Sequence, residues 1–155
     1  MIYNENYFTT ISYGMISFYN FSMRDCNRYL QMLNGFESYL YSKRYTIPNR
    51  IGLATIFIPI VFAIRVNNTE KSNLFEKGML AEELLHIIKT QEAIKNAFQN
   101  FIFYSYRIPR EDITEEDIHG LYLDIFATYT LNNASRRVTD SDRDFLKRML
   151  SIVKL

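Results

Sequence analysis

The stretch Ile51–Ile64, IGLATIFIPIVFAI, is the most apolar part of this 155-residue chain. It lies between Arg50 and Arg65 and contains Pro59, which removes one backbone donor from any helix that it joins. A helix that crosses a membrane needs about 20 apolar residues, and this run is shorter. We therefore expect a helix that is buried on all sides in the core of a globular domain, and no membrane partner.

Apolar residues recur every three or four positions on both sides of this run, which is the spacing of amphipathic helices. The predicted helices cover residues 3–19, 22–40, 51–64, 79–108, 114–129 and 139–153. Ser22, Thr114 and Thr139 are residue types that cap helix N-termini, and acidic residues follow each of them. Residues 67–73 are polar and are expected to form a connection.

In the first segment, Ile11, Tyr13 and Met15 also alternate as in a β-strand, so a strand remains an alternative there. In the second, the predicted buried stripe consists of Cys26, Tyr29, Leu30, Leu33, Phe36 and Leu40.

The composition agrees with one helical domain. A chain of this length forms a single domain of ordinary size, and 48% hydrophobic with 23% charged residues is typical of a folded protein. Five glycines and three prolines provide few tight turns, which favours helices over a many-stranded sheet. We predict an all-α fold, a compact single-domain bundle of about six helices over residues 1–155.

The net charge and the missing motifs argue against several classes of function. The net charge of +1 provides no bulk attraction for nucleic acid or membranes, and a single cysteine excludes an internal disulfide. The sequence lacks a phosphate loop, a G-x-G-x-x-G turn, HExxH and GxSxG. Residues 1–20 lack the pattern of a secretory signal. We therefore predict a cytoplasmic protein that is not an enzyme, with no catalytic residue, metal or cofactor.

Two Glu-x-x-His turns suggest a metal-binding alternative. Glu83 with His86, and Glu116 with His119, each place a carboxylate and an imidazole on one helix face. Paired turns of this kind occur in dimetal-carboxylate helical bundles. The motif formed by Glu116 and His119 lies at the N-terminal end of the helix predicted over residues 114–129. The ligands of dimetal bundles lie in the middle of their helices. A solvated face with pairs three residues apart is the simpler interpretation.

A second alternative is nucleic-acid binding through a basic cluster near the C-terminus. The cluster consists of Arg136, Arg137, Arg143, Lys147 and Arg148. Asp140, Asp142 and Asp144 lie among these residues. A groove for nucleic acid has few acidic residues, so a solvated, salt-bridged helix face is favoured.

The segment Phe21–Leu30, FSMRDCNRYL, resembles the pattern N-F-S-x-R-[DE]-x-x-R-x-L that follows the nucleotide-binding core of KAP family P-loop NTPases. The similarity covers residues 20–66 or so. The resemblance implies a helical, lid-like C-terminal region and common descent. It also matches Arg24 with an arginine that reaches nucleotide phosphates in related NTPases. The phosphate loop and its lysine are missing here, so hydrolysis is not implied.

The chain has 12 tyrosines and 12 phenylalanines, more than a small core needs, and exposed aromatic surface is common in protein interfaces. The predicted contact residues are Tyr3, Tyr7, Tyr39, Tyr41, Tyr104, Tyr106, Arg24, Arg136 and Arg137. Tyrosines that only border the core are the alternative interpretation.

These observations predict a non-enzymatic, helical protein-binding module. We expect it to dock on a larger protein complex, such as an NTPase or a defence complex, and to modulate or inhibit it. Residues with AT-rich codons are abundant, which favours a phage or a mobile element as the source. A homodimer that buries the aromatic residues is an alternative partner arrangement, and nucleic acid is not an expected partner.

Overall fold

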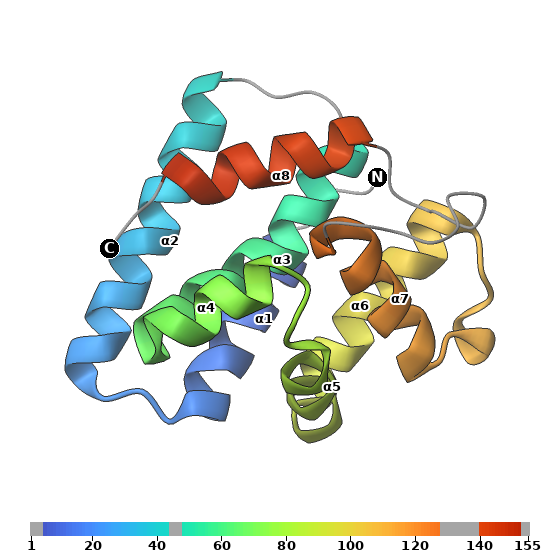
Figure 1. The fold of residues 1–155 in the computed structure, drawn as a ribbon, viewed down its shortest axis with the longest axis horizontal. Helices are drawn as coiled ribbons and strands as arrows, with labels where there is room; N and C mark the ends of the chain where they lie inside the picture. The colour runs from blue at the N-terminus through green and yellow to red at the C-terminus, as the bar shows by residue number, and fades with distance from the viewer. Residues whose placement is uncertain (1–4, 44–47, 128–139, 153–155) are drawn as a thin grey trace.

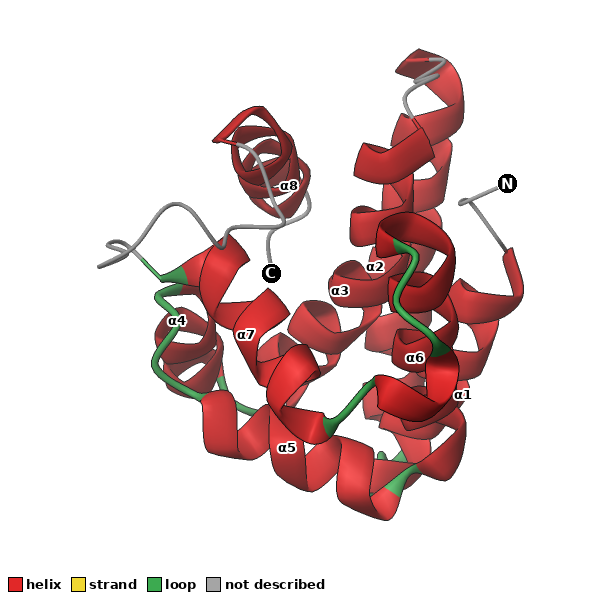
Figure 2. Cartoon of the chain, turned by 90° about the vertical axis from the view of Figure 1, so that its right-hand side faces the viewer, coloured by secondary structure: helices red, strands yellow, loops and turns green. Residues whose placement is uncertain are grey.

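The computed structural model describes residues 5–43, 48–127 and 140–152. These residues form eight α-helices and one 3₁₀-helix, with no strand among them (Figures 1 and 2). The elements are α1 (Glu5–Tyr19), α2 (Met23–Lys43), α3 (Pro48–Asn67), α4 (Thr69–Glu76), α5 (Ala81–Thr90), α6 (Glu92–Tyr106), η1 (Arg110–Asp112), α7 (Glu115–Phe126) and α8 (Asp140–Ile152). The predicted all-α class is confirmed, and the strand alternative for the first segment is wrong.

The described helices number eight rather than six because two boundaries differ from the prediction. The polar segment expected to be a connection instead begins α4, since the Asn68 side chain accepts a hydrogen bond from the backbone N–H of Lys71 (3.1 Å). The predicted helix over 79–108 breaks at Gln91, whose φ and ψ are −116° and 89°. The Thr90 hydroxyl donates to the carbonyl of His86 at that break (2.9 Å).

Helix α3 is the centre of the molecule. Every residue from Ile56 to Ile64 is buried, and α3 contacts α1, α2, α4, α6 and α8 (Figure 1). A helix without a polar face must be enclosed on all sides, and this is the arrangement predicted for the apolar run. Within the described residues, no helix is long and apolar enough to span a membrane.

Two aromatic contacts connect α2 to its neighbours. The hydroxyl of Tyr29, which is fully buried, donates to the carbonyl oxygen of Pro59 in α3 (2.7 Å). Burial raises the pKa of Tyr29 above its ordinary value, because the charged phenolate would lose its water. Phe36 stacks on Phe8 of α1 with a centroid distance of 5.9 Å. One side of α2 is thereby held against α1 and α3.

The connection from α4 to α5 is held by Gly78 and Tyr122. Gly78 has a φ of +79°, and the bonds Met79 N–H to Leu74 and Gly78 N–H to Phe75 form a Schellman motif. The buried Tyr122 hydroxyl donates to the Phe75 carbonyl (2.7 Å) and accepts from the Leu80 N–H (3.1 Å). Helix α7 thus fixes the path by which the chain leaves α4.

We predict that Tyr122→Phe destabilises the fold by about 1–3 kcal/mol, since it leaves the buried Phe75 carbonyl and the Leu80 N–H without this partner. The measurement is the free energy of unfolding from denaturant titration. Tyr104→Phe is the control, because Tyr104 is 60% exposed. Equal stability of the two variants would contradict the role assigned to Tyr122.

We also predict that stability falls as pH rises above about 10, where tyrosines of the unfolded chain ionise. Burial raises the pKa of Tyr122 to about 12, so the folded state keeps its proton over a range in which the unfolded state loses it. The contribution of Tyr122 to the free energy of unfolding is complete below about pH 10, and it is lost as the pH rises through the pKa of Tyr122 in the folded state. Unfolding free energies measured from neutral to alkaline pH should show the fall. The fall should be shallower in Tyr122→Phe than in the unmodified chain.

Candidate functional site

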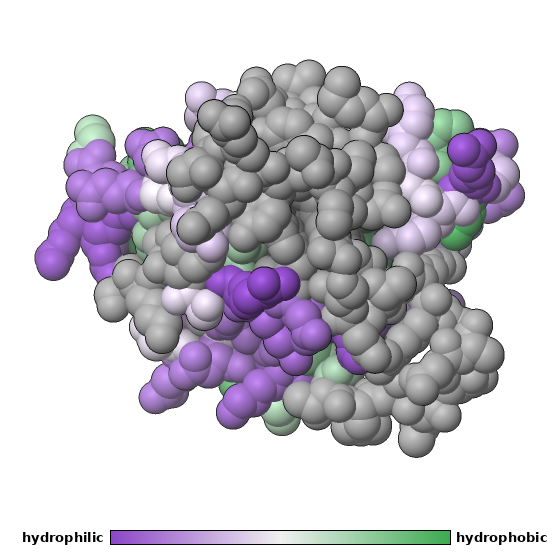
Figure 3. Space-filling view, turned by 90° about the horizontal axis from the view of Figure 1, so that it is seen from above, coloured by the Kyte–Doolittle hydropathy of each residue, from purple (hydrophilic) through white to green (hydrophobic). Residues whose placement is uncertain are grey.

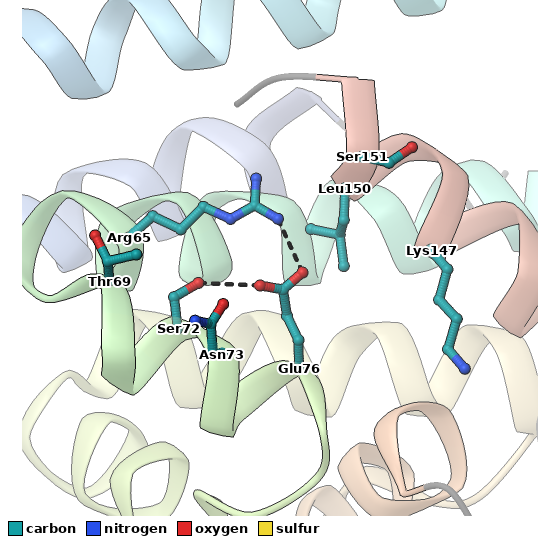
Figure 4. Close-up of a pocket in the computed structure, with 8 residues that line it drawn as sticks. All are labelled: Arg65, Thr69, Ser72, Asn73, Glu76, Lys147, Leu150 and Ser151. Atoms are coloured by element: carbon teal, nitrogen blue, oxygen red, sulfur yellow. Dashed lines mark hydrogen bonds and ion pairs between the residues drawn. The ribbon is translucent and has the colours of Figure 1, made fainter. Parts of the chain in front are cut away.

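A pocket of about 500 Å³ lies where the end of α3, helix α4 and the C-terminal half of α8 meet (Figure 4). Its lining residues are Arg65, Thr69, Ser72, Asn73, Glu76, Lys147, Leu150 and Ser151. Five of these side chains carry a neutral polar group or a carboxylate, and two carry a positive charge. Helices α3 and α4 follow one another in the sequence, whereas α8 lies more than 60 residues further on, so the pocket exists only in the folded chain.

An ion pair lies at the centre of the pocket. The Arg65 guanidinium lies 2.8 Å from one Glu76 carboxylate oxygen, and the Ser72 hydroxyl donates to the other oxygen (3.1 Å) (Figure 4). The Arg65 side chain is 13% exposed and that of Glu76 is 25% exposed. Arg65 also lies over the ring of Phe62, 5.4 Å from its centroid. The pair is therefore shielded and held in place by packing.

The sequence positions explain this geometry. Arg65 follows the buried run in the last turn of α3, where its charge can reach the edge of the core. The Asn68 cap starts α4 three residues later, so α4 packs against α3. Ser72 and Glu76 are four residues apart and share one face of α4. That face meets Arg65.

Helix α8 closes the other side of the pocket. Leu150 is 3% exposed and belongs to the core, whereas Lys147 and Ser151 are exposed. No ion pair of Lys147 occurs within the described part of the chain. Seen from above, the described surface is mostly hydrophilic, with hydrophobic side chains in small separate patches (Figure 3).

The described residues of the basic cluster near the C-terminus lie in different environments. Arg143 donates to the carbonyls of Asp124 (3.3 Å) and Ala127 (3.5 Å) at the end of α7, where the helix dipole favours a cation. Lys147 lines the pocket, and Arg148 is exposed on α8. Arg136 and Arg137 lie outside the described residues.

The predicted contact tyrosines occupy different environments. Tyr3 lies outside the residues that the structure describes. Tyr41 belongs to α2, but its side chain is not among those described. Tyr7 is 9% exposed and is part of the core, so its ring offers little surface to a partner. Tyr39 and Tyr106 are partly buried against the core. Tyr104 is 60% exposed and packs edge-on against Phe103.

The outer face of α2 carries apolar residues that the sequence interpretation missed. Met23 is 80% exposed and Leu30 is 45% exposed. They are seven residues apart and therefore lie on the same side of the helix. The prediction that Leu30 belongs to the buried stripe is wrong, because Tyr29, Leu33 and Phe36 already fill that side. The apolar spacing allowed either assignment.

The start of α2 matches the cap predicted from the sequence. The Ser22 hydroxyl accepts a hydrogen bond from the Asp25 N–H (3.2 Å). Arg24 is exposed beside Met23. Cys26 is partly buried, and its thiol lies 3.8 Å from the Phe21 carbonyl oxygen. The residues that carry the family resemblance thus include both the cap and the exposed beginning of this face.

The first Glu-x-x-His turn contacts α1. Glu83 accepts from the Tyr19 hydroxyl (3.2 Å) and pairs with Lys71 (3.2 Å), while His86 packs on Phe18. Burial and the nearby Glu83 carboxylate raise the pKa of Tyr19 above its ordinary value.

The second turn begins α7, and its Glu116 is exposed. Lys89 and Glu115 form an ion pair between α5 and α7 (3.7 Å). Among the described residues, no three His, Cys, Asp or Glu side chains gather in a way that could hold a metal ion.

Comparisons of the chain with protein-family models, with curated proteins and with solved structures found no match in any of the three.

We predict that Glu76→Gln lowers the free energy of unfolding by about 2 kcal/mol, because the shielded Arg65 guanidinium would lose its ion pair with the Glu76 carboxylate. Denaturant titration of the purified variant measures the change. Glu70→Gln is the matched control, since Glu70 is exposed on the same helix and should cost less than about 1 kcal/mol. A Glu76 variant as stable as the control would show that the ion pair contributes little.

Proposed function

We propose that this chain is a non-enzymatic helical module that docks on a partner protein through the outer face of α2. The observation that supports the proposal is the exposure of Met23 and Leu30 on one side of that helix. We define this face by Met23, Arg24, Asn27, Leu30 and Asn34, all of which are exposed. The proposal assigns no catalytic residue to the chain.

The packing of α2 explains why this face is available for docking. Tyr29, Met32, Leu33 and Phe36 bury the opposite side of the helix against the core. The outer side therefore contributes little to folding, yet it retains two large apolar side chains. Apolar residues surrounded by polar and charged ones are the usual arrangement of a protein interface. Methionine is well suited to such a face because its unbranched side chain adapts to a partner's shape.

The resemblance to KAP family NTPases supports a partner class. The similar residues include Ser22, which caps α2, and Arg24, which is exposed on the proposed docking face. A module descended from a lid-like region would retain a surface that fits an NTPase. We accordingly propose a P-loop NTPase, alone or within a defence complex, as the partner, with binding in the cytoplasm that modulates or inhibits it. A phage or a mobile element is the proposed source.

The test compares two double variants of matched chemistry. Met23→Glu/Leu30→Glu places two carboxylates on the α2 face, whereas Leu74→Glu/Met79→Glu makes the same changes at exposed residues of α4 and of the connection to α5. The tagged chain, folded by circular dichroism in each case, is used to capture partners from source cells, and captured NTPases are quantified by mass spectrometry. We expect the first variant to lose the NTPase and the second to retain it.

Light scattering of the purified chain completes the experiment. A dimer that the α2 variant converts to a monomer would replace the proposed partner with a second copy of this chain. Equal capture of an NTPase by both variants, or capture by neither the variants nor the unmodified chain, would overturn the proposal.

A further inference from the structure

The pocket between α4 and α8 has the size of a small-molecule site. Its volume of about 500 Å³ lies within the range of about 300–1,000 Å³ that is typical of ligand pockets. Leu150 and the aliphatic stems of Arg65 and Lys147 provide apolar walls, while hydroxyl and amide groups provide hydrogen bonds (Figure 4). The proposed docking face on α2 contributes no residue to it.

The charges of the lining residues do not cancel. The Glu76 carboxylate is matched by Arg65 and by the Ser72 hydroxyl, which occupy one oxygen each. Lys147 adds a second positive charge, for which the described part of the chain provides no ion pair. Among the described lining residues, two positively charged side chains accompany one carboxylate, and the Lys147 side chain lies on the exposed side of the pocket.

The neutral groups of the pocket can bind the oxygens of an anion. Thr69 and Asn73 lie on α4, and Ser151 lies on α8, so donors are present on both walls (Figure 4). Hydroxyl and amide groups donate to carboxylate and phosphate oxygens alike, and a lysine ammonium binds both as a point charge. The complementary ligand is consequently a small polar molecule with a carboxylate or phosphate group.

The geometry points to a binding site for such an anion in the α4–α8 pocket, with Lys147 as the charged contact. This inference goes beyond the proposed docking function and does not depend on it. Lys147 is exposed on α8 and makes no ion pair with a described residue, so a ligand in the pocket can reach its ammonium group. A role in ligand binding gives this charge a function.

The test is titration of the purified full chain with three anions: inorganic phosphate, citrate and adenosine monophosphate. Isothermal titration calorimetry measures the affinity, and adenosine is the neutral counterpart of the nucleotide. We expect saturable binding of at least one anion and none of adenosine. Citrate binding alone would identify a carboxylate ligand, and binding of both phosphate compounds would identify a phosphate ligand.

Two variants of neighbouring residues separate a site from general charge attraction. Lys147→Ala should weaken binding about tenfold, as expected for the loss of one charge-assisted hydrogen bond, and Lys147→Arg should retain most of it. Arg148→Ala removes the same charge one residue further along α8, outside the pocket, and should leave the affinity unchanged. Met23→Glu/Leu30→Glu should also bind the anion normally, which distinguishes this site from the docking face.

Absence of saturable binding for all three anions would overturn the inference. Equal losses for Lys147→Ala and Arg148→Ala would overturn it as well, because they would show unspecific attraction to the positive side of α8.

Discussion

The rest of the structure depends on the burial of α3. The residues from Ile56 to Ile64 have no polar side that could face water, so the chain must surround them. Helices α1, α2, α4, α6 and α8 meet this requirement from different sides. Each of these helices buries one stripe against α3 and leaves its other side to solvent. The positions of both candidate surfaces follow from that arrangement.

The C-terminal end of the buried run places a charged side chain at the edge of the core. Arg65 is the first charged residue after the apolar stretch, and its side chain remains 13% exposed. A guanidinium so close to the core requires a carboxylate and packing partners. Glu76, Ser72 and the ring of Phe62 provide them. The pocket is thus a consequence of how the fold accommodates Arg65 at the edge of its core.

The two candidate surfaces belong to different helices and have different chemistry. The outer face of α2 offers flexible apolar side chains with polar neighbours, which suits a protein partner. The pocket between α4 and α8 offers hydroxyl groups, an amide and an excess positive charge, which suits a small anion. Since they share no residue, each can be altered without changing the other.

Local sequence signals were sufficient for the helical class, for the buried helix around Pro59 and for the caps at Ser22 and Thr114, because spacing and capping act within a few residues. The same signals failed at Gln91 and Leu30. The apolar spacing continues across the break at Gln91, and it places Leu30 beside a stripe that Tyr29 and Leu33 already fill.

The sequence by itself therefore determined that this chain is helical and which run lies at its centre. Only the tertiary structure decided which sides of the helices remain outside and which distant residues meet. The pairing of Arg65 with Glu76 and the approach of Lys147 have no signature in local spacing. They arise because α4 and α8 pack against the same central helix, and contacts of that kind are set by the packing of the whole chain.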